Sequence, residues 1–155
     1  MNRSHIGYLL MLFVFGLASG CSKSDSGPTG PGTSGGPPPG SIQEIEPNDG
    51  TPQALRALDV TDIVVSGILV NDKDIDRYSI TLNGPANLFA KVSWQGSTDI
   101  DLWVTLPNNI PLTIRDTGGN PESCVLTARA AGTYFIQLTS KPSSATAYVL
   151  TIGLR

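Results

Sequence analysis

Cysteine, histidine and aromatic residues are scarce in this chain. Its 155 residues include two cysteines, Cys21 and Cys124, a single histidine, His5, and only 6% aromatic residues. His5 lies in an N-terminal segment that we expect to be removed, so the mature protein would contain no imidazole. Nucleophilic triads, histidine-ligated zinc and histidine acid–base catalysis all need that group, and we therefore do not expect them here.

Basic residues are also in short supply. The chain has 10 Lys and Arg against 13 Asp and Glu, which gives a formal net charge of −3. Nucleic-acid binding depends on a basic surface that displaces counterions from the phosphates. The charge balance therefore argues against a nucleic-acid partner.

The first twenty residues have the pattern of a secretory signal peptide. Arg3 precedes an apolar run from Ile6 to Ala18, and small residues stand just before Cys21, where a peptidase would cut. The run is well short of the roughly 20 residues that a membrane-spanning helix needs. We therefore expect residues 1–20 to be a cleaved signal peptide.

The junction Ala18-Ser19-Gly20-Cys21 resembles the lipobox of bacterial lipoproteins. The resemblance implies that Cys21 carries a diacylglycerol, becomes the mature N-terminus and anchors the protein in a membrane, which labelling with a palmitate analogue would detect. Two or more acyl chains give a stable anchor, since each buried methylene contributes about 0.8 kcal/mol. Ser22 is not the aspartate that often signals inner-membrane retention, so the resemblance favours the outer membrane. The alternative is an ordinary signal peptide followed by a chance cysteine.

The segment after the anchor differs in composition from the rest of the chain. Residues 22–40 are almost entirely Ser, Gly, Pro and Thr, with too little apolar surface to offset the entropy of ordering. We expect a disordered tether that spans at most about 60 Å. The predicted organisation is a signal peptide at 1–20, the lipidated cysteine and tether at 21–40, and one folded domain at 41–155.

Short β-type segments fill the folded part. Apolar and polar residues alternate with a period of two, and Gly, Pro, Asn and Asp separate the segments, which predicts an all-β antiparallel sandwich. About eight strands are expected, near residues 63–70, 78–82, 88–94, 100–106, 111–115, 123–129, 134–138 and 148–154. Trp94 and Trp103 are interpreted as core or sandwich-edge residues, and Cys124 as a small buried hydrophobe.

An ordered set of short motifs runs through this region. It comprises "EIEPND" at 44–49, "SGILVNDKDIDRYSITL" at 66–82, "STDIDLWV" at 97–104, "AGTYFIQLTS" at 131–140 and "AYVLTI" at 147–152. The set resembles the bacterial pre-peptidase C-terminal domain. This resemblance implies a jelly-roll-like β-sandwich of the kind that trails the catalytic domain of a secreted protease.

No catalytic protease domain accompanies these motifs, so we expect a non-catalytic binding or accessory module on a lipid tether in the cell envelope. Its partner would be an extracellular protein, a polysaccharide or a protease. The alternative function is a hydrolase, or the detached accessory tail of a secreted protease encoded nearby.

Acidic residues are crowded between Glu44 and Asp76, and clustered carboxylates repel one another unless a cation or a pKa shift relieves them. Asp72, Asp74 and Asp76 match the start of an EF-hand loop, but Arg77 stands where that loop requires glycine. The family resemblance implies another arrangement, in which a calcium ion is held by Glu44, Glu46, Asn48, Asp49, Asp74 and Asp76. The alternative is that these are solvated turn residues.

A second acidic pair, Asp99 and Asp101, lies at positions i and i+2 of an expected strand. Such residues share one face with side chains roughly 7 Å apart, within the carboxylate spacing of inverting glycosidases. The low aromatic content argues against a sugar-binding cleft, so we expect the pair to cap or edge the strand rather than to act in catalysis.

Overall fold

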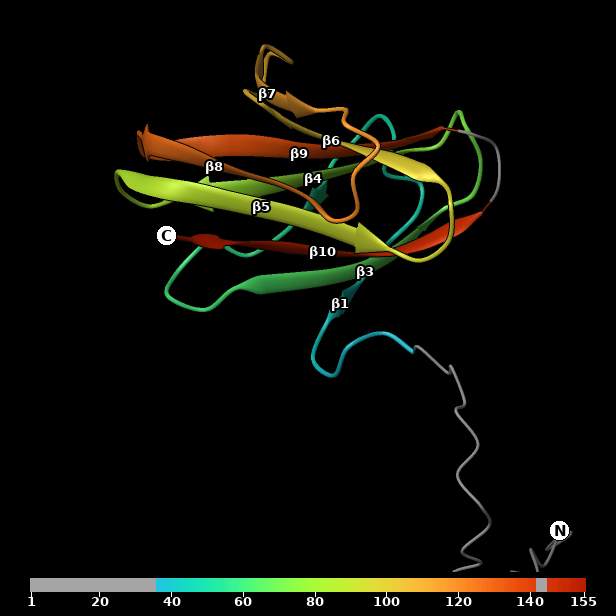
Figure 1. The fold of residues 1–155 in the computed structure, drawn as a ribbon. Helices are drawn as coiled ribbons and strands as arrows, with labels where there is room; N and C mark the ends of the chain where they lie inside the picture. The colour runs from blue at the N-terminus through green and yellow to red at the C-terminus, as the bar shows by residue number, and fades with distance from the viewer. Residues whose placement is uncertain (1–35, 142–144) are drawn as a thin grey trace, which may run out of the picture. The chain divides into compact units, whose positions relative to one another are not determined.

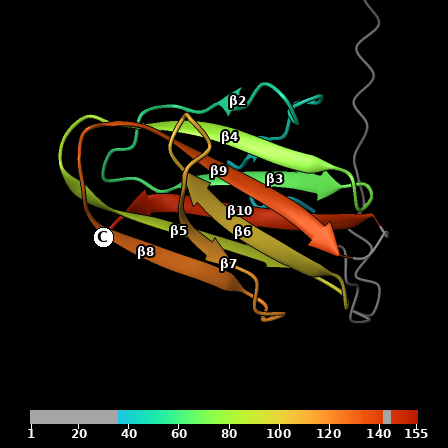
Figure 2. The same ribbon diagram turned by 90° about the horizontal axis from the view of Figure 1, so that it is seen from above.

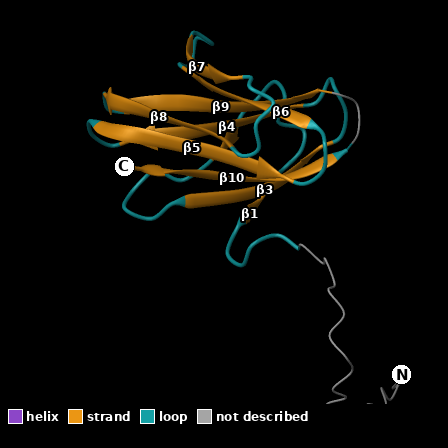
Figure 3. Ribbon diagram, in the orientation of Figure 1, coloured by secondary structure: helices purple, strands orange, loops and turns teal. Residues whose placement is uncertain are grey.

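The computed structural model describes residues 36–141 and 145–155. The expected signal peptide, Cys21 and most of the tether lie outside these residues. Strands and loops account for the described part, which has no helix (Figure 3). Accordingly, nothing in this part of the chain is a helix long and apolar enough to cross a membrane.

Ten strands form two five-stranded sheets that face each other as two layers (Figure 1). In spatial order, the first sheet contains β1 (Ile42–Gln43), β3 (Ile63–Leu69), β10 (Thr146–Leu154), β5 (Ala86–Trp94) and β8 (Glu122–Arg129). The second contains β2 (Gln53–Ala54), β4 (Ile75–Leu82), β9 (Gly132–Lys141), β6 (Asp99–Thr105) and β7 (Pro111–Arg115). The predicted β-sandwich is confirmed, and the eight predicted strands correspond to β3–β10.

The core lies between the two layers and follows the alternation in the sequence. In β4, Tyr78, Ile80 and Leu82 point inward and are buried, while the residues between them face outward. Trp94 and Cys124 are buried as expected, and Trp103 is half-buried on the outer side of β6. All ten strands and this core lie between residues 42 and 154, so the described part contains a complete sandwich with its own core.

Two very short strands, which the sequence did not predict, connect the start of the domain to both sheets. β1 pairs in parallel with β3, with Ile42 opposite Val65, and β2 pairs in parallel with β4, with Gln53 opposite Tyr78. Figure 2 shows β2 beside β4 at the edge of the second sheet. Because β1 and β2 belong to different sheets, the acidic residues 44–49 lie where the chain crosses from one sheet to the other.

Candidate metal centre

The acidic segment after β1 is fixed by hydrogen bonds to both sheets. The Glu44 amide donates to the Ser66 carbonyl of β3 at 3.0 Å. Asn48 is buried; its side-chain amide donates to Glu44 Oε1 at 3.1 Å, and its Oδ1 accepts from the Arg77 amide of β4 at 3.2 Å. Asn48 therefore orients Glu44 and attaches the segment to β4.

The aspartates at the start of β4 meet this segment from the other side. Asp74 accepts a hydrogen bond from the Val70 amide at 2.6 Å, and Asp49 accepts one from the Ile75 amide at 3.2 Å. Carboxylate oxygens of Glu44, Glu46 and Asp76 lie within 4.8 Å of one another, as do those of Glu46, Asp49 and Asp74. The structure thus brings five of the predicted ligands together. We call these five carboxylates the seam cluster, and Asn48 hydrogen-bonds within it.

Asp76 is the unusual member of the seam cluster. It is fully buried, and neither carboxylate oxygen has a hydrogen-bond partner of normal geometry among the described residues. Burial, followed by the nearby Glu44, raises the pKa of Asp76 to about 9. Burial is also the main cause of the raised pKa of Asp74 and of Glu46. An ionised carboxylate in such a place is costly unless a cation or hydrogen bonds compensate it.

Two tyrosines form the inner wall of the seam cluster. The hydroxyls of Tyr78 and Tyr148 lie 3.2 and 3.0 Å from Glu44 Oε1 and hydrogen-bond to each other, so one hydroxyl donates to the other while the second donates to Glu44. Burial raises the pKa of both phenols, so they remain hydrogen-bond donors. The alternating pattern placed both tyrosines in the core but gave no sign that their hydroxyls reach Glu44.

Gly67 makes that contact sterically feasible. It lies opposite Tyr148 in the β3–β10 ladder, and a Cβ at position 67 would lie 2.3 Å from the Tyr148 hydroxyl oxygen and 2.8 Å from Glu44 Oε2. A glycine in a strand often marks a close approach of this kind. This glycine is the one sequence signal that could have indicated the tyrosine–glutamate contact.

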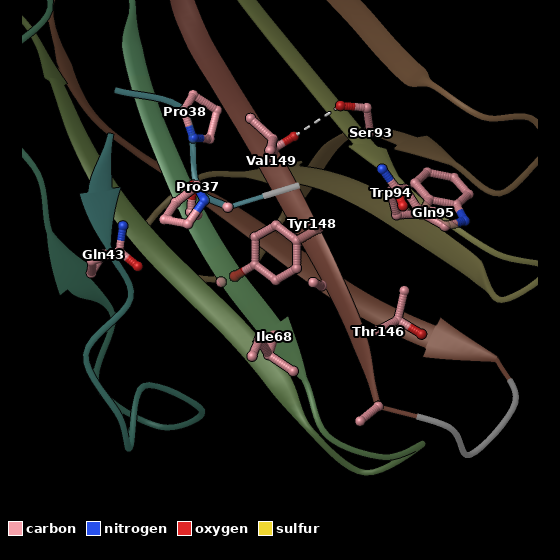
Figure 4. Close-up of a pocket in the computed structure, with 15 residues that line it drawn as sticks. Pro37, Pro38, Gln43, Ile68, Ser93, Trp94, Gln95, Thr146, Tyr148 and Val149 are labelled. Carbon is pink, nitrogen blue, oxygen red and sulfur yellow. Dashed lines mark hydrogen bonds between the residues drawn. The ribbon is translucent and has the colours of Figure 1, made fainter. Parts of the chain in front are cut away.

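Two adjoining hollows lie beside the seam cluster. The smaller, of about 310 Å³, is lined by Glu44, Glu46, Ile68 and Val70 among others. The larger, of about 580 Å³, shares Gly67 and Ile68 with it and extends across the first sheet. Figure 4 shows that Pro37, Pro38, Tyr148 and Val149 line the larger hollow. The acidic residues therefore open onto a groove with partly apolar walls.

A second group of carboxylates lies on the outer side of the second sheet. Oxygens of Asp99, Asp101 and Asp116 lie within 4.8 Å of one another, and the Lys141 ammonium is 3.0 Å from Asp101 Oδ2 and 2.9 Å from Asp116 Oδ1. We call these four residues the lysine cluster. The separation of the Asp99 and Asp101 oxygens is shorter than the carboxylate spacing of about 6.5–9.5 Å in inverting glycosidases. The geometry of Asp99 and Asp101 therefore does not match that of an inverting glycosidase.

The comparisons with known proteins agree with this architecture. Residues 74–140 match the bacterial pre-peptidase C-terminal domain family. The chain is also similar in structure to the pre-peptidase C-terminal domain of a collagenase from Bacillus anthracis, with 14% identity and a TM-score of 0.55 over 65% of this chain and 95% of that one. At this identity the likeness supports the fold alone.

A weaker likeness is to PliG, a periplasmic inhibitor of g-type lysozyme from Aeromonas hydrophila. It shows 15% identity over 66% of this chain and 98% of that one, and its TM-score of 0.44 is too low to support an argument. The curated proteins include no match to this sequence. The family resemblance proposed from the ordered motifs is thus supported for residues 74–140, which include Asp74 and Asp76 of the seam cluster.

Proposed function

We propose that this protein is a lipid-anchored envelope protein that displays a non-catalytic accessory or binding domain stiffened by calcium at the seam cluster. The observation that carries the calcium proposal is the fully buried Asp76, which lies beside four other carboxylates and whose two oxygens have no hydrogen-bond partner of normal geometry among the described residues. Calcium takes six to eight hard oxygen ligands, and carboxylates are the usual protein contribution. The residues present suit such an ion.

Each member of the seam cluster has a role in this proposal. Glu44, Glu46 and Asp76 supply one group of carboxylates and Glu46, Asp49 and Asp74 the other, with Glu46 shared. Asn48 and the two phenols orient Glu44. A bound calcium ion would supply the positive charge that allows Asp76 to ionise in the core. It would also link residues 44–49 to β4, and thereby hold the entry of the domain against both sheets.

Thermal unfolding of residues 36–155 in millimolar calcium and in chelator tests this proposal. A ligand that binds only the folded state stabilises it by about 2.7 kcal/mol at 100 times its Kd, which for a domain this small raises the midpoint by several degrees. The variants Asp74→Ala and Glu44→Ala/Glu46→Ala should lose that increase. Equal midpoints of the unmodified domain in calcium and chelator would return these residues to the role of solvated turn formers.

The anchor has its own test, because it depends on residues outside the described part. Cells given a palmitate analogue should label the full chain, and Cys21→Ser should abolish the label. Continued labelling of the serine variant would contradict lipidation at Cys21. The proposed location is the outer membrane. The proposed partner is an extracellular protein, a polysaccharide or a protease, and the detached accessory tail of a protease remains the second candidate because the matched family is described as pre-peptidase C-terminal.

A further inference from the structure

Three exposed aliphatic residues adjoin the seam cluster. Ile45, Ile68 and Val70 are 67%, 50% and 57% exposed, and they are three of the seven large hydrophobic residues exposed in the described part of the chain. The backbone attaches each of them directly to the cluster. Ile45 lies between Glu44 and Glu46, the Ile68 amide donates to Glu44 Oε2 at 2.8 Å, and the Val70 amide donates to Asp74.

The hollow beside the cluster combines these two chemistries. Its walls include the carboxylate residues Glu44 and Glu46 together with Ile68 and Val70, so acidic and apolar groups open onto the same space. Lys73, in the short loop between β3 and β4, is also exposed. The rim of this hollow, which includes Ile68 and Val70, therefore places aliphatic surface beside a set of carboxylates.

We infer that, when calcium occupies the seam cluster, this rim seats the domain on an anionic phospholipid surface. The inference rests on the proposed calcium site. An ion with six to eight oxygen ligands can accept some of them from outside the protein, and lipid phosphates are hard oxygen donors of the right charge. Ile68 and Val70 would enter the apolar boundary beneath the headgroups, where buried aliphatic area strengthens interfacial binding.

The path of the chain favours a membrane over a soluble partner. β1 is the first strand (Figure 1), and Glu44 follows it immediately, so along the chain the rim adjoins the point where the chain enters the sandwich. With a lipid on Cys21, that entry point is never farther from the bilayer than the tether allows, at most about 60 Å. The carboxylates repel anionic lipid when no cation is present, which makes seating depend on calcium.

Co-sedimentation of residues 36–155 with vesicles provides the test, because this part contains the whole sandwich and lacks the anchor. The vesicles are phosphatidylcholine with and without phosphatidylglycerol, in calcium, in magnesium and in chelator. We expect binding only with phosphatidylglycerol and calcium. Ile68→Ser/Val70→Ser should weaken vesicle binding about tenfold, or about 1.4 kcal/mol. The control Ile114→Ser/Val125→Ser alters exposed aliphatic residues of β7 and β8, and it should bind as the unmodified domain does.

Calcium-dependent melting of the same samples separates the two proposals. A calcium-dependent rise in the midpoint without vesicle binding overturns the lipid inference and leaves the calcium site standing. No rise in the unmodified domain overturns both. Vesicle binding that persists in chelator, or that is equal in Ile68→Ser/Val70→Ser, also overturns the inference. Full displacement by soluble polyglutamate overturns it in favour of an acidic protein partner. Full displacement by glycerol phosphate overturns it in favour of recognition of a free headgroup.

Discussion

The seam cluster and the lysine cluster place carboxylates at similar separations but compensate their charge differently. In the lysine cluster, Asp101 is 4% exposed and the half-exposed Lys141 bridges it to Asp116. None of the ion pairs among the described residues involves a member of the seam cluster. One group of carboxylates thus has a cation within the chain, while the other leaves Asp76 buried without one. Carboxylate crowding alone therefore does not distinguish the two clusters; they differ because the seam cluster contains a buried acid that no side-chain cation among the described residues neutralises.

The largest expected effect comes from removing the buried acid in each cluster and comparing the responses to calcium. Asp76→Asn should abolish the calcium-dependent stabilisation, which is about 2.7 kcal/mol at 100 times the Kd, because asparagine cannot supply the negative charge. Asp101→Asn should retain it in full. Urea unfolding in calcium and in chelator measures both differences.

In chelator, Asp76→Asn should change stability little at neutral pH. The raised pKa means that Asp76 is already protonated there, and asparagine has nearly the same shape and is also neutral. A calcium response that survives Asp76→Asn, or disappears in Asp101→Asn, would reverse the assignment of the two clusters.

The sequence predicted the sandwich because its strands alternate so regularly. Segments such as Tyr78-Ile80-Leu82 have only one arrangement that buries every large apolar residue, so eight strands could be located from the pattern. β1 and β2 were missed because two residues cannot show a period. Their pairing depends on which sheet edges are free, a property of the assembled fold rather than of the local sequence.

The residues of the candidate site could be predicted from the sequence, but their burial and hydrogen bonding could not. The resemblance named Glu44, Glu46, Asp49, Asp74 and Asp76, and the structure brings them together. Burial of Asp76 follows from its inward position on β4, and the Tyr148 contact follows from a glycine on a neighbouring strand. Both depend on pairing between distant segments. The lysine cluster depends likewise on β6 pairing with β9, which places Asp99 opposite Lys141.

The pH dependence of stability should sharpen the comparison further. In chelator, the pKa of Asp76 is about 9 in the folded protein and near 3.8 when unfolded, so its contribution is fully present below pH 4 and is lost as the pH rises toward 9. The free energy of unfolding should fall with pH in that window, by at most about 1.4 kcal/mol per pH unit for this group. Asp74, Glu46 and Asp101, with raised pKa values, add in the same direction.

Calcium should oppose this loss, because the ion binds the ionised form that high pH favours. The difference between the calcium and chelator curves should therefore widen from pH 5 to pH 8, and Asp76→Asn should flatten the chelator curve. Urea unfolding at unit pH intervals gives the slopes. Parallel curves in calcium and chelator would show that calcium does not act on a group that titrates in this window.

The smallest expected effect tests whether Lys141 supplies the positive charge that the carboxylates of the lysine cluster need. In the folded protein, Asp116 and Asp101 raise the pKa of Lys141, so the ammonium stays charged. Lys141→Met keeps a side chain of similar length but leaves Asp101 without its ion pair. Since Lys141 is half-exposed and solvent screens the pair, the expected loss of stability is small. Adding Asp101→Asn should restore most of it, because the uncompensated buried charge is then gone.

Lys141→Met should also gain a calcium response of its own, measured in the Asp76→Asn background where the seam cluster no longer responds to calcium. Lys91→Met on β5 serves as the matched control. If Lys141→Met/Asp76→Asn melts at the same temperature in calcium and in chelator, Lys141 is an ordinary ion-pair partner, and its presence does not explain why the two clusters differ.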